Sequence, residues 1–148
     1  MIIKNGLVFQ EDGSFCKKDV YIRDHQIVEA EDMTEDRTVL DAEGLMVLPG
    51  LVDIHSHGAA GEDFSDGDPD GLKKILRYEK QSGITSYCPT SMTLPKEKLH
   101  RIFEAVRQAE HREDEAVIRG INMEGPFLDP ARKGAHVEEW ICLSLIHI

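Results

Sequence analysis

Two histidines separated by one residue follow a short apolar run, and this motif constrains the chain more than any other stretch. It lies within Leu48–Gly58, where Leu-Val-Asp-Ile precedes His55 and His57. Because side chains alternate between the two faces of a strand, both imidazoles are expected on the same face. Neutral imidazole is the commonest metal ligand in proteins, so the pair can hold an ion at the end of a strand. On spacing alone, a solvated loop is the alternative.

The residues around the histidine pair indicate a strand rather than a loop. Leu51, Val52 and Ile54 are expected to enter a core immediately before the histidines. Gly58 and Gly61 follow and give the chain freedom to turn. A buried parallel strand that delivers polar side chains to a glycine-containing loop is typical of α/β active sites.

Composition excludes two classes of partner. The 148 residues include 28 acidic and 17 basic side chains, which give a formal net charge of −11. Nucleic-acid binding requires clustered Lys and Arg, so no nucleic-acid partner is expected. No apolar run approaches the roughly 18 residues that cross a bilayer, so no membrane partner is expected. The cysteines, Cys16, Cys88 and Cys142, are odd in number and widely spaced, which is typical of reduced thiols in a cytoplasmic protein.

Residues 1–47 have the pattern of a small β domain. Short apolar runs, among them Leu7-Val8-Phe9 and Val20-Tyr21-Ile22, are separated by the turn pairs Asn5-Gly6 and Asp12-Gly13. Apolar runs punctuated in this way predict a small antiparallel sheet. No candidate catalytic residue is evident in this segment.

The pattern beyond the histidines alternates between strands and helices. Pro69 and Pro95 each open a segment with apolar residues at helical spacing. The expected strands are 51–54, 84–88 and 116–123, and Pro89 is expected to end the second of them. Strand, helix, strand, helix, strand is the order of a parallel sheet with right-handed crossovers, so we predict an α/β fold.

Four motifs together resemble those of a known enzyme family. They are Pro49–Gly58, Gly61–Asp66, Asn122–Leu128 and Lys133–His136. The first resembles the first-strand signature of the amidohydrolase superfamily, whose members are metal-dependent hydrolases built on a (β/α)8 TIM barrel. The other three narrow the resemblance to the N-acetylglucosamine-6-phosphate deacetylases. The resemblance extends from Met1 to about Ile141.

The resemblance implies a truncated chain with parts of two domains. Residues 1–47 would be the N-terminal part of a small β-sandwich domain. Residues 48–141 would form the first part of the TIM barrel, about three of its β/α units. A complete barrel needs roughly 250 residues, which is more than this chain contains.

The resemblance also implies a set of site residues. Glu124 matches a metal-binding glutamate, and His55 and His57 make a second ion possible. Carboxylate and imidazole together suit zinc, with iron, cobalt and manganese as the alternatives. Ala135 and His136 match positions that contact the sugar-phosphate substrate. The alternative for Glu124 is a solvated carboxylate in a Gly-Pro turn.

Two further side chains are expected near the site, but neither is assigned to catalysis. Asp53 is expected to share the face of the histidines and to orient a ligand imidazole. Lys133 could approach a phosphate, although a lone lysine is usually solvated. The catalytic aspartate of the family would lie beyond Ile148, so no catalytic residue is assigned within the chain.

The activity implied by the resemblance is metal-assisted hydrolysis of an amide. The substrate would be N-acetyl-D-glucosamine 6-phosphate, and the products would be acetate and D-glucosamine 6-phosphate, in amino-sugar catabolism. The full-length enzyme would be a homo-oligomer. One alternative is an amidohydrolase of cyclic amides, of the dihydroorotase or hydantoinase type, although these commonly have a carboxylated lysine where Glu124 stands. The other is a non-catalytic fragment that binds metal.

The last residues require a separate interpretation. Leu143–Ile148 is the translation of CTG-TCT-CTT-ATA-CAC-ATC, a transposon end used in preparing sequencing libraries. We therefore expect residues 142–148 to be a non-native, adapter-derived tail, and His147 is not counted as a metal ligand. A natural apolar segment that enters the next element is the alternative.

Overall fold

A computed structural model describes residues 1–33 and 38–143, and the described residues divide after Pro49 into two compact units. The boundary lies two residues from the one expected at 47/48. Of the expected non-native tail, only Cys142 and Leu143 lie within the described residues. None of the helices in the described part of the chain combines the length and the apolar character that a bilayer-crossing helix requires.

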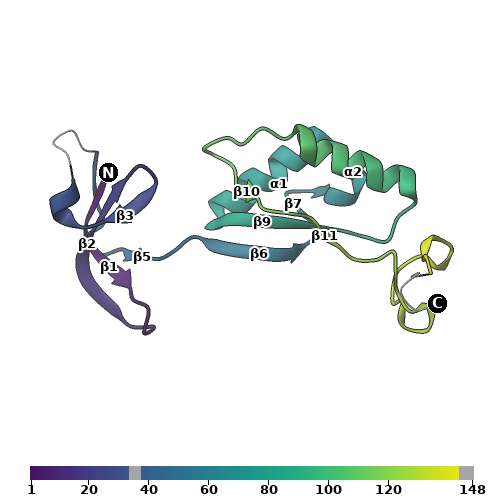
Figure 1. Ribbon diagram of the computed structural model, residues 1–148, viewed down its shortest axis with the longest axis horizontal. Coiled ribbons are helices and arrows are strands. Elements are labelled where there is room, and N and C mark those ends of the chain that lie inside the picture. The colour runs from purple at the N-terminus through teal and green to yellow at the C-terminus, as the bar shows by residue number, and fades with distance from the viewer. Residues whose placement is uncertain (34–37, 144–148) are drawn as a thin grey trace. The chain divides into compact units, whose positions relative to one another are not determined.

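The first unit is a single mixed sheet (Figure 1). Its strands are β1 (Ile2–Phe9), β2 (Phe15–Arg23), β3 (Gln26–Val28), β4 (Val39–Asp41) and β5 (Met46–Val47). The strand order is β3-β2-β1-β4, and β5 also pairs with β1. The sheet was expected to be antiparallel, but β4 and β5 run parallel to β1. Local turn signals predict hairpins, whereas these two pairings join segments far apart in the sequence.

The pair Asn5-Gly6 lies within β1 and does not form the expected turn. The pairing of β1 with β2 shifts register between Ile3 and Gly6, which marks a bulge. Asn5 has a φ of 61°, and its N–H donates to Asp19 Oδ1 at 3.0 Å. A Cβ on Gly6 would lie 2.5 Å from Val47 Cγ2, so the absence of a side chain at this position allows β5 to lie close to β1. The turn at Asp12-Gly13, which joins β1 to β2, is confirmed.

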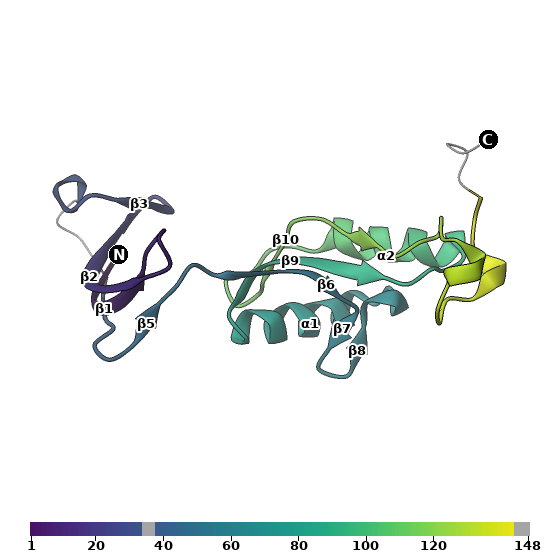
Figure 2. The ribbon, with the colours of Figure 1, turned by 90° about the horizontal axis from the view of Figure 1, so that it is seen from below.

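The second unit is α/β, as expected. Its main elements are β6 (Leu51–Ser56), α1 (Pro69–Gln81), β9 (Ile84–Ser91), α2 (Lys96–Gln108), β10 (Val117–Ile118) and β11 (Asn122–Met123). β6, β10 and β11 each pair with β9 in parallel. Both helices lie on the same side of β9 in Figure 1, and Figure 2 shows the hairpin of β7 (Gly58–Ala59) and β8 (Glu62–Asp63) beside α1.

The helices begin where the sequence predicts. Asp68 caps α1, because its carboxylate accepts hydrogen bonds from the N–H groups of Asp70 and Gly71, and Pro69 occupies the first helical position. Pro95 is the residue before α2. The apolar faces of both helices pack on β9 in one core: Phe64, Leu72, Ile75, Leu76, Tyr87, Leu94, Leu99, Ile102, Ala105 and Ala116.

Tyr87 connects this core to the histidine-bearing strand. It is fully buried, and its hydroxyl donates a hydrogen bond of 3.1 Å to the main-chain oxygen of Ser56 at the end of β6. Burial raises the pKa of Tyr87 to about 12, so the phenol remains neutral and keeps its proton for this bond.

Two expectations about the extent of the strands were wrong in detail. β9 continues through Pro89 to Ser91. The neighbouring strand is interrupted at that level, since β10 pairs with Ser86 and Tyr87 and β11 with Thr90 and Ser91. Proline lacks the N–H that would bond to a neighbouring strand. Because the β10–β11 segment is interrupted beside Pro89, no hydrogen bond from that residue is needed on this side of β9. The expected strand 116–123 is accordingly split into β10 and β11.

The apolar residues of β6 are exposed, not buried as expected. Leu51, Val52 and Ile54 retain 59%, 64% and 65% of their accessible surface. The helices cover the side of the sheet on which Tyr87 is buried, and in the described residues nothing covers these three side chains to a comparable degree.

Candidate metal centre

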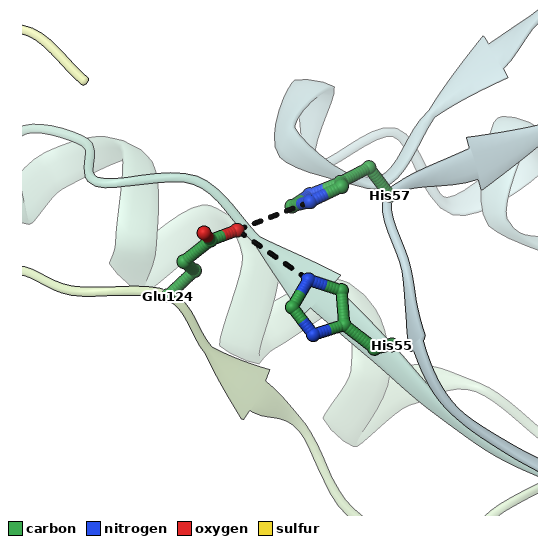
Figure 3. Close-up of side chains that lie close together, drawn as sticks. All are labelled: His55, His57 and Glu124. Atoms are coloured by element: carbon green, nitrogen blue, oxygen red, sulfur yellow. Dashed lines mark ion pairs between the residues drawn. The ribbon is translucent and has the colours of Figure 1, made fainter. Parts of the chain in front are cut away.

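Three side chains converge at the end of the parallel sheet (Figure 3). His57 Nε2 lies 3.1 Å from Glu124 Oε2, and His55 Nε2 lies 3.6 Å from the same oxygen. One donor atom from each residue falls within 4.8 Å of the other two, so the group could hold a metal ion. The structure therefore brings together the three residues that the sequence motifs indicated as candidate metal ligands.

Parallel pairing explains this convergence. β9 lies between β6 and the β10–β11 segment, and all of these strands run in one direction. His55 lies near the carboxyl end of β6, and Glu124 follows β11 directly. The Glu124 N–H donates to the Ser91 carbonyl at 3.1 Å, which anchors the main chain of the glutamate to the end of β9. The carboxyl ends of parallel strands share one edge, where α/β proteins place their ligands.

The hydrogen bond of His57 fixes the position of its proton. His57 Nδ1 lies 3.1 Å from the carbonyl oxygen of Thr90, which can only accept, so Nδ1 carries the hydrogen of the neutral ring. The Nε2 lone pair then faces a carboxylate oxygen of Glu124. Two lone-pair atoms at that distance require a cation or a proton between them. Donation of the second ring N–H to a main-chain carbonyl is also the usual arrangement of a metal-ligating histidine.

The ring of His55 is less constrained. The Asn122 side-chain amide donates to the Ile54 carbonyl at 3.1 Å and to Thr90 Oγ1 at 3.3 Å, while its contact with His55 Nδ1 is longer, at 3.5 Å. The two amide hydrogens are satisfied by the shorter contacts. Asn122 therefore does not need to donate to Nδ1, which would force the ring hydrogen onto Nε2. With the hydrogen on Nδ1, Nε2 can present its lone pair to an ion.

Asp53 contacts the site through the main chain. Its Oδ1 accepts a hydrogen bond of 2.8 Å from the His55 backbone N–H, whereas the sequence suggested a contact with a ligand imidazole. The pairing of β6 with β9 shifts register between Asp53 and Ser56. Such an irregularity breaks the strict alternation of faces on which that expectation depended.

His136 lies in a loop, as expected, but its side chain is buried. It is 8% exposed, and its Nε2 lies 3.4 Å from Glu124 Oε1. Ala135 is exposed beside it. Both residues line a pocket of about 360 Å³ whose other walls are His57, Met92, Glu124, Leu128, Arg132, Lys133 and Gly134. The two residues proposed for substrate thus share a pocket with two of the proposed metal ligands.

Sequence reasoning missed two residues near the site. Arg132 lines the same pocket as Lys133, so the pocket has two basic side chains where only a lone lysine was considered. The adjacent positions of the two residues were a visible signal. Thr93 donates a hydrogen bond of 3.0 Å to the Glu124 carbonyl, and no spacing or motif indicated this.

No family model matches the chain. The N-acetylglucosamine-6-phosphate deacetylase of Mus musculus is 30% identical over 137 residues, which cover 87% of this chain and 34% of the relative. The Homo sapiens protein of the same name is 31% identical over 134 residues, 85% of this chain and 33% of the relative. The chain spans about a third of the length of these curated relatives.

A third relative has a different sugar in its name. The N-acetylgalactosamine-6-phosphate deacetylase of Escherichia coli O157:H7 is 31% identical over 139 residues, which cover 93% of this chain and 36% of the relative.

Solved structures show the same similarity. The N-acetylglucosamine-6-phosphate deacetylase of Pasteurella multocida matches with a TM-score of 0.78 and 25% identity, over 99% of this chain and 40% of that chain. A mutant of the Mycobacterium smegmatis enzyme, in complex with N-acetyl-D-glucosamine 6-phosphate, matches with a TM-score of 0.71 and 26% identity, over 97% of this chain and 37% of that chain.

Proposed function

Because this chain belongs to the N-acetylglucosamine-6-phosphate deacetylase family, we propose that it forms the N-terminal part of a metal-dependent amide hydrolase. The proposed reaction releases acetate from N-acetyl-D-glucosamine 6-phosphate and leaves D-glucosamine 6-phosphate. The activity belongs to the longer polypeptide, of which residues 1–47 contribute part of a small β domain and residues 48–141 the start of a TIM barrel. We propose a cytoplasmic homo-oligomer with a role in amino-sugar catabolism.

The contact between His57 and Glu124 is the observation that carries this proposal. A lone pair on Nε2 and a carboxylate oxygen 3.1 Å apart suit an intervening divalent cation. The donors are two imidazoles and one carboxylate, a set that favours zinc and also accommodates iron, cobalt or manganese. We propose that His55, His57 and Glu124 hold one or two such ions.

Each residue near the site has a proposed part in the reaction. A bound divalent cation supplies the Lewis acidity that polarises an amide carbonyl and acidifies a water molecule. His55, His57 and Glu124 fix the place of that chemistry at the carboxyl edge of the sheet. Ala135 and His136 line the adjacent pocket and are proposed to contact the sugar phosphate.

Charge and donor type support a phosphorylated amide as substrate. Arg132 and Lys133 present positive charge to the pocket, although the chain carries a net charge of −11. Guanidinium and ammonium groups are the usual partners of phosphate. The family's catalytic aspartate is proposed to lie in the part of the relatives that this chain does not span.

A second substrate has support from one relative. The Escherichia coli protein named for N-acetylgalactosamine 6-phosphate is as similar to this chain as the mammalian proteins are. The two sugars differ only in the configuration of one hydroxyl group, so the same metal group and phosphate pocket serve both. By contrast, the cyclic-amide alternative is not favoured. Those enzymes commonly have a carboxylated lysine at the position where Glu124 approaches both histidines in this chain.

Metal binding can be tested on the chain itself. We expect equilibrium dialysis against Zn²⁺ or Co²⁺ to find one or two ions per chain, and His57→Ala or Glu124→Ala to weaken binding strongly. His100→Ala is the matched control, since His100 is exposed on α2 and is not part of the site. Equal binding by all four proteins would contradict the proposed metal centre.

Activity is tested on the polypeptide that the complete locus encodes. The locus is resequenced from untagmented DNA across the codons for Trp140 to Ile148, and the encoded protein is assayed for acetate release. Hydrolysis of N-acetyl-D-glucosamine 6-phosphate, abolished by Glu124→Ala, supports the proposal. Preference for the galactosamine epimer selects the second substrate, and hydrolysis of neither sugar supports a metal-binding role without catalysis.

A further inference from the structure

Thr93 holds two parts of the site at once. This residue, in the loop between β9 and α2, is 2% exposed. Its backbone N–H donates to His136 Nδ1 at 3.3 Å, and its Oγ1 donates to the Glu124 carbonyl at 3.0 Å. A single buried residue thus connects the glutamate after β11 with the histidine that follows η3 (Pro130–Arg132).

The contact with Thr93 settles which nitrogen of His136 carries the hydrogen. A backbone N–H can only donate, so the Nδ1 that receives it has no proton, and the hydrogen of the neutral ring is on Nε2. Nε2 lies 3.4 Å from Glu124 Oε1. The nitrogen that carries the hydrogen is thus the one that lies near Oε1 of Glu124, while both metal-facing histidines approach the other oxygen, Oε2.

The turn at Glu124 is closely fitted to Thr93. Gly125 has a φ of +91°, and a Cβ there would lie 2.0 Å from Thr93 Oγ1. Only glycine accommodates both the backbone conformation and the close approach of the hydroxyl. The hydrogen bond from Thr93 to the Glu124 carbonyl is thus part of a packed arrangement.

We propose that Thr93 and His136 are positioning residues of the metal centre. His136 Nε2–H occupies Oε1 of Glu124 and so directs Oε2 to the ion, while Thr93 holds the imidazole in the required tautomer and fixes the Glu124 main chain. The proposal rests on the metal site proposed above and adds a role for His136 beyond substrate contact. Before substrate binds, its one N–H faces Glu124, and a bound sugar phosphate would receive that N–H in place of Glu124, so the two roles belong to different states of the site.

The tautomer is tested without metal. In the ¹⁵N-labelled chain at a pH where His136 is neutral, long-range ¹H–¹⁵N spectra distinguish a protonated from an unprotonated ring nitrogen. We expect Nδ1 of His136 to be unprotonated and Nε2 to carry the hydrogen, with the opposite assignment for His57. A hydrogen on Nδ1 of His136 would overturn the proposal, whether or not the chain binds an ion.

Two substitutions of His136 separate its two contacts. The amide nitrogen of His136→Gln can reach the place of Nε2 and still donate to Glu124. The amide oxygen of His136→Asn can reach the place of Nδ1 and accept from Thr93, but it offers Glu124 no donor. With Co²⁺ as the probe, we expect Asn to weaken binding by about 10- to 100-fold, as loss of an outer partner does in other metal sites, and Gln to stay close to the unaltered chain.

Thr93 supplies a second matched pair. Thr93→Ser keeps the hydroxyl and should keep Co²⁺ affinity, whereas Thr93→Val removes the bond to the Glu124 carbonyl and should lower it. Unchanged affinity in both His136→Asn and Thr93→Val, with His57→Ala still deficient, would overturn the positioning role and leave the proposed metal centre standing. If even the unaltered chain fails to bind Co²⁺, the proposed metal centre fails, and the positioning role that rests on it fails with it, whatever the imidazole spectra show.

Discussion

β9 and β6 are neighbours in one parallel sheet, yet their environments differ. β9 is covered by α1 and α2, and Tyr87 on it is fully buried with Ile75 and Ile102 of the helices. On β6, Val52 and Ile54 remain mostly exposed, and the proposed ligand His55 follows directly. The core that holds the unit together and the strand that supplies the histidines are therefore adjacent but separate. Changes in one are expected to affect folding, and changes in the other metal binding.

The largest effect is expected in the helix-covered core. Ile75 on α1 is fully buried against β9 and α2, so Ile75→Ala should lower the free energy of unfolding by about 2–5 kcal/mol through lost burial and a residual cavity. Denaturant titration measures the change. A loss below 1 kcal/mol, in a protein that still melts cooperatively, would show that the core is less closely packed than described.

The second-largest loss of stability is expected at the ion pair between Arg77 and Glu115. Arg77 on α1 lies 3.0 Å from Glu115, whose side chain is almost fully buried, and 2.9 Å from Asp114. Arg77→Ala leaves a buried carboxylate without its partner and should cost about 1–3 kcal/mol. Lys73→Ala is the control, because Lys73 pairs with the exposed Asp70 on the same helix. Equal loss in both variants would show that the effect does not arise from the buried carboxylate of Glu115.

A smaller effect, of opposite sign, is expected at Glu79. Burial, together with the negative charge of Asp53, raises the pKa of Glu79. The folded state therefore favours the protonated carboxyl, a stabilisation that is complete below the ordinary pKa of 4.5 and is lost as pH rises through the raised value. Glu79→Gln cannot ionise and should gain about 1 kcal/mol at pH 7, the size of one buried polar interaction. The gain should vanish below pH 4.5; a gain independent of pH would exclude this cause.

The smallest effect is expected on β6, and it sharpens the comparison with Ile75. Ile54→Ala makes the same substitution at a residue that is 65% exposed, so the free energy of unfolding of the 148-residue chain should change by less than about 0.5 kcal/mol. A loss as large as that at Ile75 would mean that another surface, such as a second copy of the chain, covers β6 in solution.

Local signals predicted most of the elements. Pro69 and Pro95 mark both helix starts, and apolar residues at helical spacing identify the buried face of each helix. The grouping of His55, His57 and Glu124 was also predicted, because parallel strands bring their carboxyl ends to one edge.

Features that depend on neighbouring segments were not predicted. Val52 and Ile54 resemble core residues in the sequence, but burial is decided by which side of the sheet the helices cover. Pro89 resembles a strand end, and only the interruption between β10 and β11 shows how the strand continues through it. His136 lies in the expected loop, but its burial and its contact with Thr93 depend on the fold.

The position of the single tryptophan has a consequence for spectroscopy. Trp140 closes η4 (Glu138–Trp140), a few residues after His136, and packs against the helix-covered core. Indole emission from this chain therefore originates in the segment of the second unit that carries His136. Its intensity and wavelength provide an intrinsic optical signal for any movement of that segment, with no added dye.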